Sequence, residues 1–127
     1  MTIKRIEAGS RMSQAVIHGD TVYLAGQVAL KSPGKPVGEQ TREILGSIER
    51  LLKEAGSEKA KLLSAQIWLA DMSKFNEMNE VWDAWVSPGN TPARATVEAK
   101  PDTMLGYRDR RTRALRWETP DSSSESP

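Results

Sequence analysis

Strand-type and helix-type patterns alternate along this chain, and their order constrains its fold more than any other feature. Residues 14–28 read as a β-hairpin, with Val16 and Tyr23 on either side of a His-Gly-Asp turn. Apolar residues then recur at helical spacing (Ile44, Leu45, Ile48, Leu51 and Leu52). We expect this helix to end at Gly56. Gly46 costs it about 1 kcal/mol relative to alanine, which close packing of the helix on a sheet would explain.

The second half of the chain repeats the order of strand and helix. Residues 63–69 alternate in polarity, which predicts a strand with one face in the core (Leu63, Ala65, Ile67 and Leu69). Ser73 is the expected N-cap of a second helix. The apolar stripe of that helix has helical spacing (Phe75, Met78, Val81, Trp82 and Trp85). Together the patterns predict an α+β layer fold, with two helices packed on one face of a mixed sheet.

Residues 92–98 read Pro-Ala-Arg-Ala-Thr-Val-Glu and predict a further strand. Arg94, Thr96 and Glu98 share one face of such a strand, because side chains alternate. Pro92 is tolerated at its start, where no ladder donor is required. The planar guanidinium of Arg94 suits a carboxylate held through two parallel hydrogen bonds. An ordinary arginine on a solvated strand face is an equally good reading.

Composition narrows the possible functions. The 127 residues suffice for one domain, and the absence of cysteine excludes disulfides and thiolate metal sites. A net charge of +1 argues against nucleic-acid binding through the whole surface. No long apolar run follows Met1, so we expect no signal peptide or membrane span, and a cytoplasmic protein. His18 is the sole histidine and reads as a surface residue, without a triad or metal set around it.

The order of these elements resembles that of the RidA/YjgF reactive-intermediate deaminase family over residues 1–107. The segments that match are the hairpin strand, the helix after it, the strand at residues 65–71, the helix with Phe75, Asn79 and Trp82, and the Pro-Ala-Arg strand. This resemblance implies the chorismate-mutase-like fold and a homotrimer with ligand sites between subunits. It implies no metal or organic cofactor.

The resemblance also implies an activity. Members hydrolyse small reactive 2-imino and enamine carboxylic acids to 2-keto acids and ammonia. Arg94 occupies the position of the family's carboxylate-binding arginine, Asn79 that of an asparagine on the second helix, and Gly26 that of the glycine beside the ligand. Asn79 shares the apolar stripe with Phe75 and Trp82, so its amide must find a partner. A structural hydrogen bond from helix to strand is as good a reading for Asn79 as a ligand contact.

Three polar site residues of the family, a serine, a tyrosine and a glutamate, are missing here. Ala25 stands where the well-studied deaminases carry a serine, and Met12 stands at about the position of their tyrosine. The glutamate of their final strand is absent, and Glu98 reads as structural. The catalytic residues are therefore unknown. A non-catalytic trimer that binds small carboxylates is the alternative function, and an RNA-associated protein is a distant third.

The C-terminal segment departs from the family. Residues 108–113, Arg-Asp-Arg-Arg-Thr-Arg, replace an apolar strand and cannot form a buried one, because unpaired charges are costly inside. Residues 119–127 are rich in Ser, Glu and Pro and predict disorder. Permitted codons for residues 108–113, shifted by one nucleotide, encode Glu-Ile-Ala-Val-Arg, which suggests a frame-shifted last strand. A genuine basic tail is the alternative. We expect a disrupted last strand, which either destabilises the sheet or recruits another segment to fill the gap.

Overall fold

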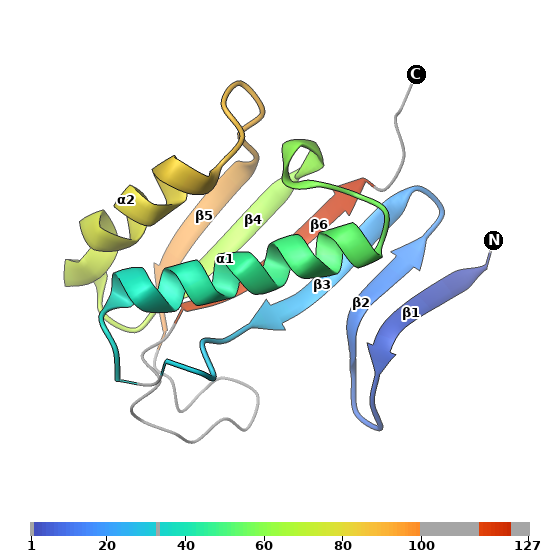
Figure 1. Ribbon diagram of the computed structural model, residues 1–127, viewed down its shortest axis with the longest axis horizontal. Coiled ribbons are helices and arrows are strands. Elements are labelled where there is room, and N and C mark those ends of the chain that lie inside the picture. The colour runs from blue at the N-terminus through green and yellow to red at the C-terminus, as the bar shows by residue number, and fades with distance from the viewer. Residues whose placement is uncertain (1, 33, 100–114, 123–127) are drawn as a thin grey trace.

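The computed structural model describes residues 2–32 and 34–99, together with the backbone of residues 115–122. Within these residues one six-stranded sheet has the order β1-β2-β3-β6-β4-β5 (Figure 1). The strands are β1 (Ile3–Ala8), β2 (Ser13–His18), β3 (Thr21–Gln27), β4 (Ser64–Leu69), β5 (Ala93–Glu98) and β6 (Leu115–Ser122). Adjacent strands are antiparallel, except that β4 and β5 are parallel. The expected mixed sheet is confirmed.

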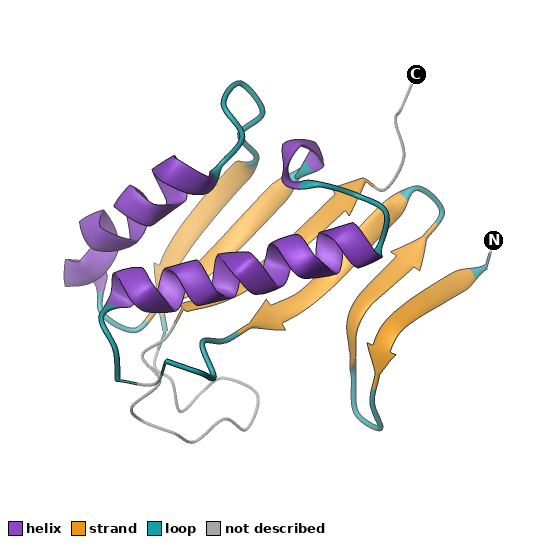
Figure 2. Cartoon of the chain, in the orientation of Figure 1, coloured by secondary structure: helices purple, strands orange, loops and turns teal. Residues whose placement is uncertain are grey.

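Two helices, α1 (Val37–Glu54) and α2 (Phe75–Trp85), lie over the same face of this sheet (Figure 2). Short 3₁₀ turns occur at Lys59–Lys61 and Met72–Lys74. The largest fully buried apolar side chains come from both layers (Val22, Ile44, Leu45, Ile48, Leu51, Leu52, Ile67, Leu69 and Met78). The apolar stripes predicted for the two helices therefore face the sheet, and the α+β layer fold is confirmed.

The C-terminal end of α1 is the glycine stop that the sequence predicts. Gly56 has φ +81°, and its N–H donates to the carbonyl of Lys53 at 3.0 Å. The N–H of Ser57 reaches back to the carbonyl of Leu52 at 2.8 Å, which completes a Schellman cap. The explanation offered for Gly46 is wrong. Gly46 is exposed, and a Cβ added there would meet no atom within 4 Å, so the helix does not need it for close packing.

Three local features differ from the sequence-based expectations. Leu63 precedes β4 and is 55% exposed, while Leu62 is buried in its place. Ser73 is not the cap of α2, because its N–H donates to the Asp71 carboxylate at 2.9 Å within the 3₁₀ turn before the helix. The sequence patterns did not predict strand β1. It lies at the edge of the sheet, where Ile6 is its only buried residue.

The structure corrects the expectation of disorder for residues 119–122, whereas residues 123–127 lie outside the described residues. Residues 119–122 form the second half of β6, in which Thr119 pairs with Leu24 and Pro120 with Tyr23. The physical reason is the gap between β3 and β4, which would leave two rows of unpaired N–H and C=O groups. Apart from Pro120, which has no N–H, the residues of this segment supply backbone donors and acceptors whatever their side chains. A later segment therefore fills the gap, as the recruitment alternative anticipated. Residues 108–113 and the frame-shift hypothesis lie outside the described residues, and the domain boundary at residue 107 stays a prediction.

The sheet face opposite the helices carries exposed apolar side chains. On β5, Ala93, Ala95 and Val97 are exposed, whereas Arg94 and Thr96 on the helix side are partly buried. Tyr23 in β3 is 51% exposed on the same open face. The usual arrangement, with apolar residues inward and polar residues outward, is thus reversed in β5. Such a face is typical of a surface covered by another subunit.

Candidate functional site

Arg94 lies near the start of β5, on the side of the sheet that the helices cover. It is paired in register with Ala65 of β4, whose side chain is buried. The Nη1 atom of Arg94 donates to Oδ1 of Asn79 on α2 at 2.8 Å. The structure therefore contains the helix-to-strand hydrogen bond that was one of the two readings for Asn79.

Two aromatic rings of α2 flank the same guanidinium. Its Cζ atom lies 5.2 Å from the centre of the Trp82 ring and 5.9 Å from that of Phe75. Phe75, Asn79 and Trp82 are four and three residues apart, so they project from one face of the helix. The sequence showed this stripe, but we did not predict that its rings would contact Arg94. The helical spacing of Phe75, Asn79 and Trp82 was the sequence signal that could have indicated these contacts.

The electrostatics of Arg94 follow from this position. Burial lowers its pKa, and the nearby Asp83 carboxylate partly opposes that effect. An arginine pKa is so high that the side chain stays charged at neutral pH. A guanidinium carries five N–H donors, and Asn79 is the only acceptor that it bonds among the described residues. The group is thus a partly desolvated cation with donors left for a ligand.

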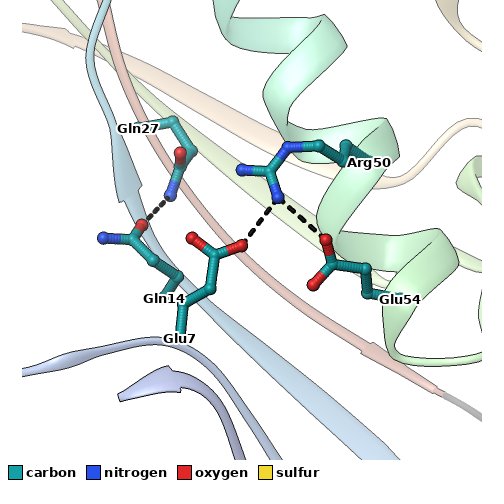
Figure 3. Close-up of polar contacts among 5 residues, drawn as sticks. All are labelled: Glu7, Gln14, Gln27, Arg50 and Glu54. Atoms are coloured by element: carbon teal, nitrogen blue, oxygen red, sulfur yellow. Dashed lines mark hydrogen bonds and ion pairs between the residues drawn. The ribbon is translucent and has the colours of Figure 1, made fainter. Parts of the chain in front are cut away.

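The other predicted site residues lie on the β2–β3 hairpin. Met12 precedes β2 and is 44% exposed, and it lies at the same end of the hairpin as Ala25 and Gly26 because the strands are antiparallel. The Nε2 atom of Gln27 donates to Oε1 of Gln14 at 2.9 Å (Figure 3). It also donates to the carbonyl oxygen of Ala25 at 3.1 Å. Gln27 is therefore a buried structural residue that fixes this end of β3.

One chain does not bring the two groups of predicted residues together. Strands β6 and β4 separate β3 from β5, and three strand spacings amount to about 14 Å. Arg94 also lies on the helix side of β5, whereas Ala25 and Gly26 lie in an irregular part of β3, between Leu24 and Gln27. A site that uses both groups must therefore include residues from two copies of the chain.

Two neighbours of Arg94 on its strand face complete the local picture. The hydroxyl of Thr96 is buried and has no hydrogen-bond partner among the described residues. The Glu98 carboxylate accepts the N–H of Met72 at 3.0 Å, a backbone contact that fits the structural reading of this residue. No cluster of three or more metal-binding side chains occurs in the described part of the chain.

Comparison with known proteins places the chain in a family. Residues 2–102 match the family described as Endoribonuclease L-PSP. A RutC family protein of Haemophilus influenzae is 47% identical over 100 residues, which are 79% of this chain and 86% of that protein. The RutC family protein YoaB of Escherichia coli is 43% identical over 99 residues, which are 78% of this chain and 85% of that protein.

Solved structures agree with these sequence matches. The crystal structure of a YjgF family member from Neisseria meningitidis has a TM-score of 0.87 and 36% identity. The match covers 99% of this chain and 98% of that one. The chain belongs to the RidA/YjgF family, as the order of its motifs indicated. No described helix is long and apolar enough to cross a membrane.

Proposed function

We propose that this protein hydrolyses small reactive 2-imino and enamine carboxylic acids, and that Arg94 holds the substrate carboxylate. The observation that carries the proposal is the partly buried guanidinium, which is fixed by Asn79 and bonds no other acceptor among the described residues. Paired hydrogen bonds from a guanidinium match the geometry of a carboxylate. Family membership supports the reaction type.

The chemistry asks little of the protein beyond positioning. Water adds to the carbon of the C=N bond, a proton moves to nitrogen, and ammonia leaves as the carbonyl forms. Anchoring the carboxylate next to that carbon holds the substrate where a positioned water can attack, which is catalysis by proximity. No described residue is assigned as the proton carrier. Ala25 and Met12 cannot donate or accept a proton through their side chains.

We further propose a homotrimer with the ligand sites between subunits. The separation of Arg94 from Gly26 within one chain supports this, because only a second copy can complete a site that contains both. The exposed apolar face of β5 and Tyr23 of β3 supply a surface that such an assembly would bury. A cytoplasmic location stays a prediction.

Ammonia release tests the proposal. An amino-acid oxidase generates 2-imino acids in the assay, and wild type is compared with Arg94→Ala and with Arg42→Ala, an exposed arginine on α1. We expect faster release with wild type and Arg42→Ala, and none beyond background with Arg94→Ala. Equal acceleration by Arg94→Ala would reject Arg94 as the anchor. Size measurements and unfolding curves confirm that each variant is assembled.

A second candidate is a trimer that binds small carboxylates without turnover. The specific observation in its favour is the loss of the hydroxyl groups at Met12 and Ala25. Binding of pyruvate that requires Arg94, with no acceleration of ammonia release, would establish this alternative. The family description includes an endoribonuclease, but the net charge of +1 gives no general support for RNA binding.

A further inference from the structure

We infer that Phe75 and Trp82 are positioning residues for Arg94. Their rings hold the guanidinium in the orientation set by Asn79 and keep its remaining donors directed at a planar carboxylate. This inference rests on the proposed function, since it explains how the anchor is prepared for its ligand. It assigns a role to two aromatic residues that would otherwise count only as core.

The contacts surround the guanidinium with partners from a single helix. Asn79 Oδ1 accepts its Nη1–H at 2.8 Å, and the two ring centres lie 5.2 and 5.9 Å from its Cζ atom. Both distances are within the range at which the face of an aromatic ring attracts a cation. Because all three partners project from α2, that helix fixes the anchor as one unit.

The Trp82 ring is itself held in place. Trp82 is only 6% exposed and packs against Trp85, with ring centroids 5.6 Å apart. Trp85 in turn donates its indole N–H to Glu49 of α1 at 2.6 Å. A chain of contacts thus runs from α1 through both indoles to Arg94. The ring can restrain the guanidinium because it is not free to swing away.

The benefit for binding is pre-organisation. A free arginine side chain has many rotamers, and a ligand must oppose the entropy lost when it orders them. An anchor already ordered by the rings loses less on binding. Removing a ring should therefore weaken carboxylate binding even though the charge of Arg94 and its bond to Asn79 remain.

The test uses the full-length chain with pyruvate as the probe, and measures affinity by NMR titration. Trp82→Leu removes the ring and Trp82→Phe keeps one. We expect Trp82→Leu to weaken pyruvate binding about two- to fivefold, the range that one cation–π contact supports. Trp82→Phe should stay within about twofold of wild type. Phe75→Leu, at a partly buried position, provides a second variant if Trp82→Leu fails to fold.

A control separates positioning from stability. Val81→Ala removes buried volume from α2 without removing a ring, so it should lower the unfolding midpoint and leave pyruvate affinity unchanged. The Nε–H signal of Arg94 gives a direct readout. It should show faster water exchange in Trp82→Leu and Phe75→Leu, and not in Val81→Ala.

The outcomes distinguish this inference from the proposed function. Wild-type affinity and exchange in Trp82→Leu and Phe75→Leu would overturn the positioning role, even if Arg94→Ala abolishes binding. Binding that survives Arg94→Ala would instead overturn the proposed function. If wild type binds no pyruvate, the Nε–H exchange still decides whether the rings restrain Arg94.

Discussion

Asn79 holds the guanidinium of Arg94 through a hydrogen bond. The contribution of that bond to stability can be measured without a substrate. Oδ1 of Asn79 is the acceptor for the partly buried guanidinium of Arg94. Removing that acceptor leaves a partly desolvated N–H unpaired, which costs about 1–2 kcal/mol for a donor that carries charge.

We predict that Asn79→Ala lowers the free energy of unfolding by about 1–2 kcal/mol, measured with urea. The matched control is Asn76→Ala, an exposed asparagine of the same helix. Both changes replace asparagine with alanine on α2, so the difference between the two variants estimates the contribution of the hydrogen bond. Equal stability of the two variants would show that the bond contributes nothing.

Glu7 adopts a backbone conformation that is unusual for its residue type, with φ +50°. The Glu7 carboxylate accepts a hydrogen bond from Nη1 of Arg50 on α1 at 2.7 Å (Figure 3). Arg50 also contacts Glu54 at 2.9 Å. The bond to Glu7 is the main cause of the raised pKa of Arg50. Both partners are about half exposed, so solvent weakens the pair.

Two substitutions at Glu7 separate backbone strain from the ion pair. Both Glu7→Ala and Glu7→Gly remove the carboxylate, but only glycine adopts a positive φ freely. The positive φ costs alanine about 1–2 kcal/mol. Glycine adopts it freely, but ordering glycine costs about 0.5–1 kcal/mol in chain entropy. We predict that Glu7→Gly is the more stable variant by about 0.5–1 kcal/mol in thermal or urea unfolding. A more stable Glu7→Ala would mean that no such strain exists.

At the scale of elements, the glycines of α1 play opposite roles. Gly46 is exposed in the helix interior, and its Cβ position is open. Gly56 has a positive φ at the Schellman cap, where an L side chain is strained.

We predict that Gly46→Ala raises the free energy of unfolding by about 0.5–1 kcal/mol, and that Gly56→Ala lowers it by about 1 kcal/mol. Urea unfolding of the two variants side by side checks both signs. Destabilisation by Gly46→Ala would indicate that its open Cβ position is filled in the assembled protein.

Sequence patterns predicted elements well where periodicity was strong. The apolar repeat of α1 and its glycine stop, the β2–β3 hairpin and the inward stripe of α2 are all present. The sequence patterns gave wrong predictions where one residue determined the local structure. Ser73 had the right type for a cap, but Asp71 takes its N–H in the 3₁₀ turn before α2. Strand β6 could not be predicted from its composition, because its place comes from unpaired groups on β3 and β4 that only the tertiary fold brings together.

The candidate site was predicted in part. The family resemblance identified Arg94 and Asn79 as site residues. Their positions on a strand and on a helix allowed the hydrogen bond that the structure contains. The distance of Gly26 from Arg94 was not predictable from one-dimensional patterns, since it depends on β6 and β4 lying between β3 and β5.

At the scale of the whole molecule, β6 joins the two halves of the sheet. It pairs with β3 on one side and β4 on the other, so its removal would expose both as edges. We predict that a chain ending at residue 114 loses the cooperative thermal transition, and the reference is a chain ending at residue 122, which keeps all of β6. Circular dichroism melts of the two truncations measure this. An unchanged melt for the shorter chain would show that β6 does not hold the sheet together.

The central claim is that one site combines Arg94 of one subunit with the β3 strand of another, and mixed assembly tests it most directly. Arg94→Ala and Gly26→Val are each expected to be inactive alone. Subunits of the two variants are dissociated, mixed in equal amounts and reassembled. Random trimers should then recover about a quarter of the wild-type rate of ammonia release, because that share of sites pairs an intact Arg94 with an intact Gly26. No recovery from properly mixed trimers would contradict a site shared between subunits.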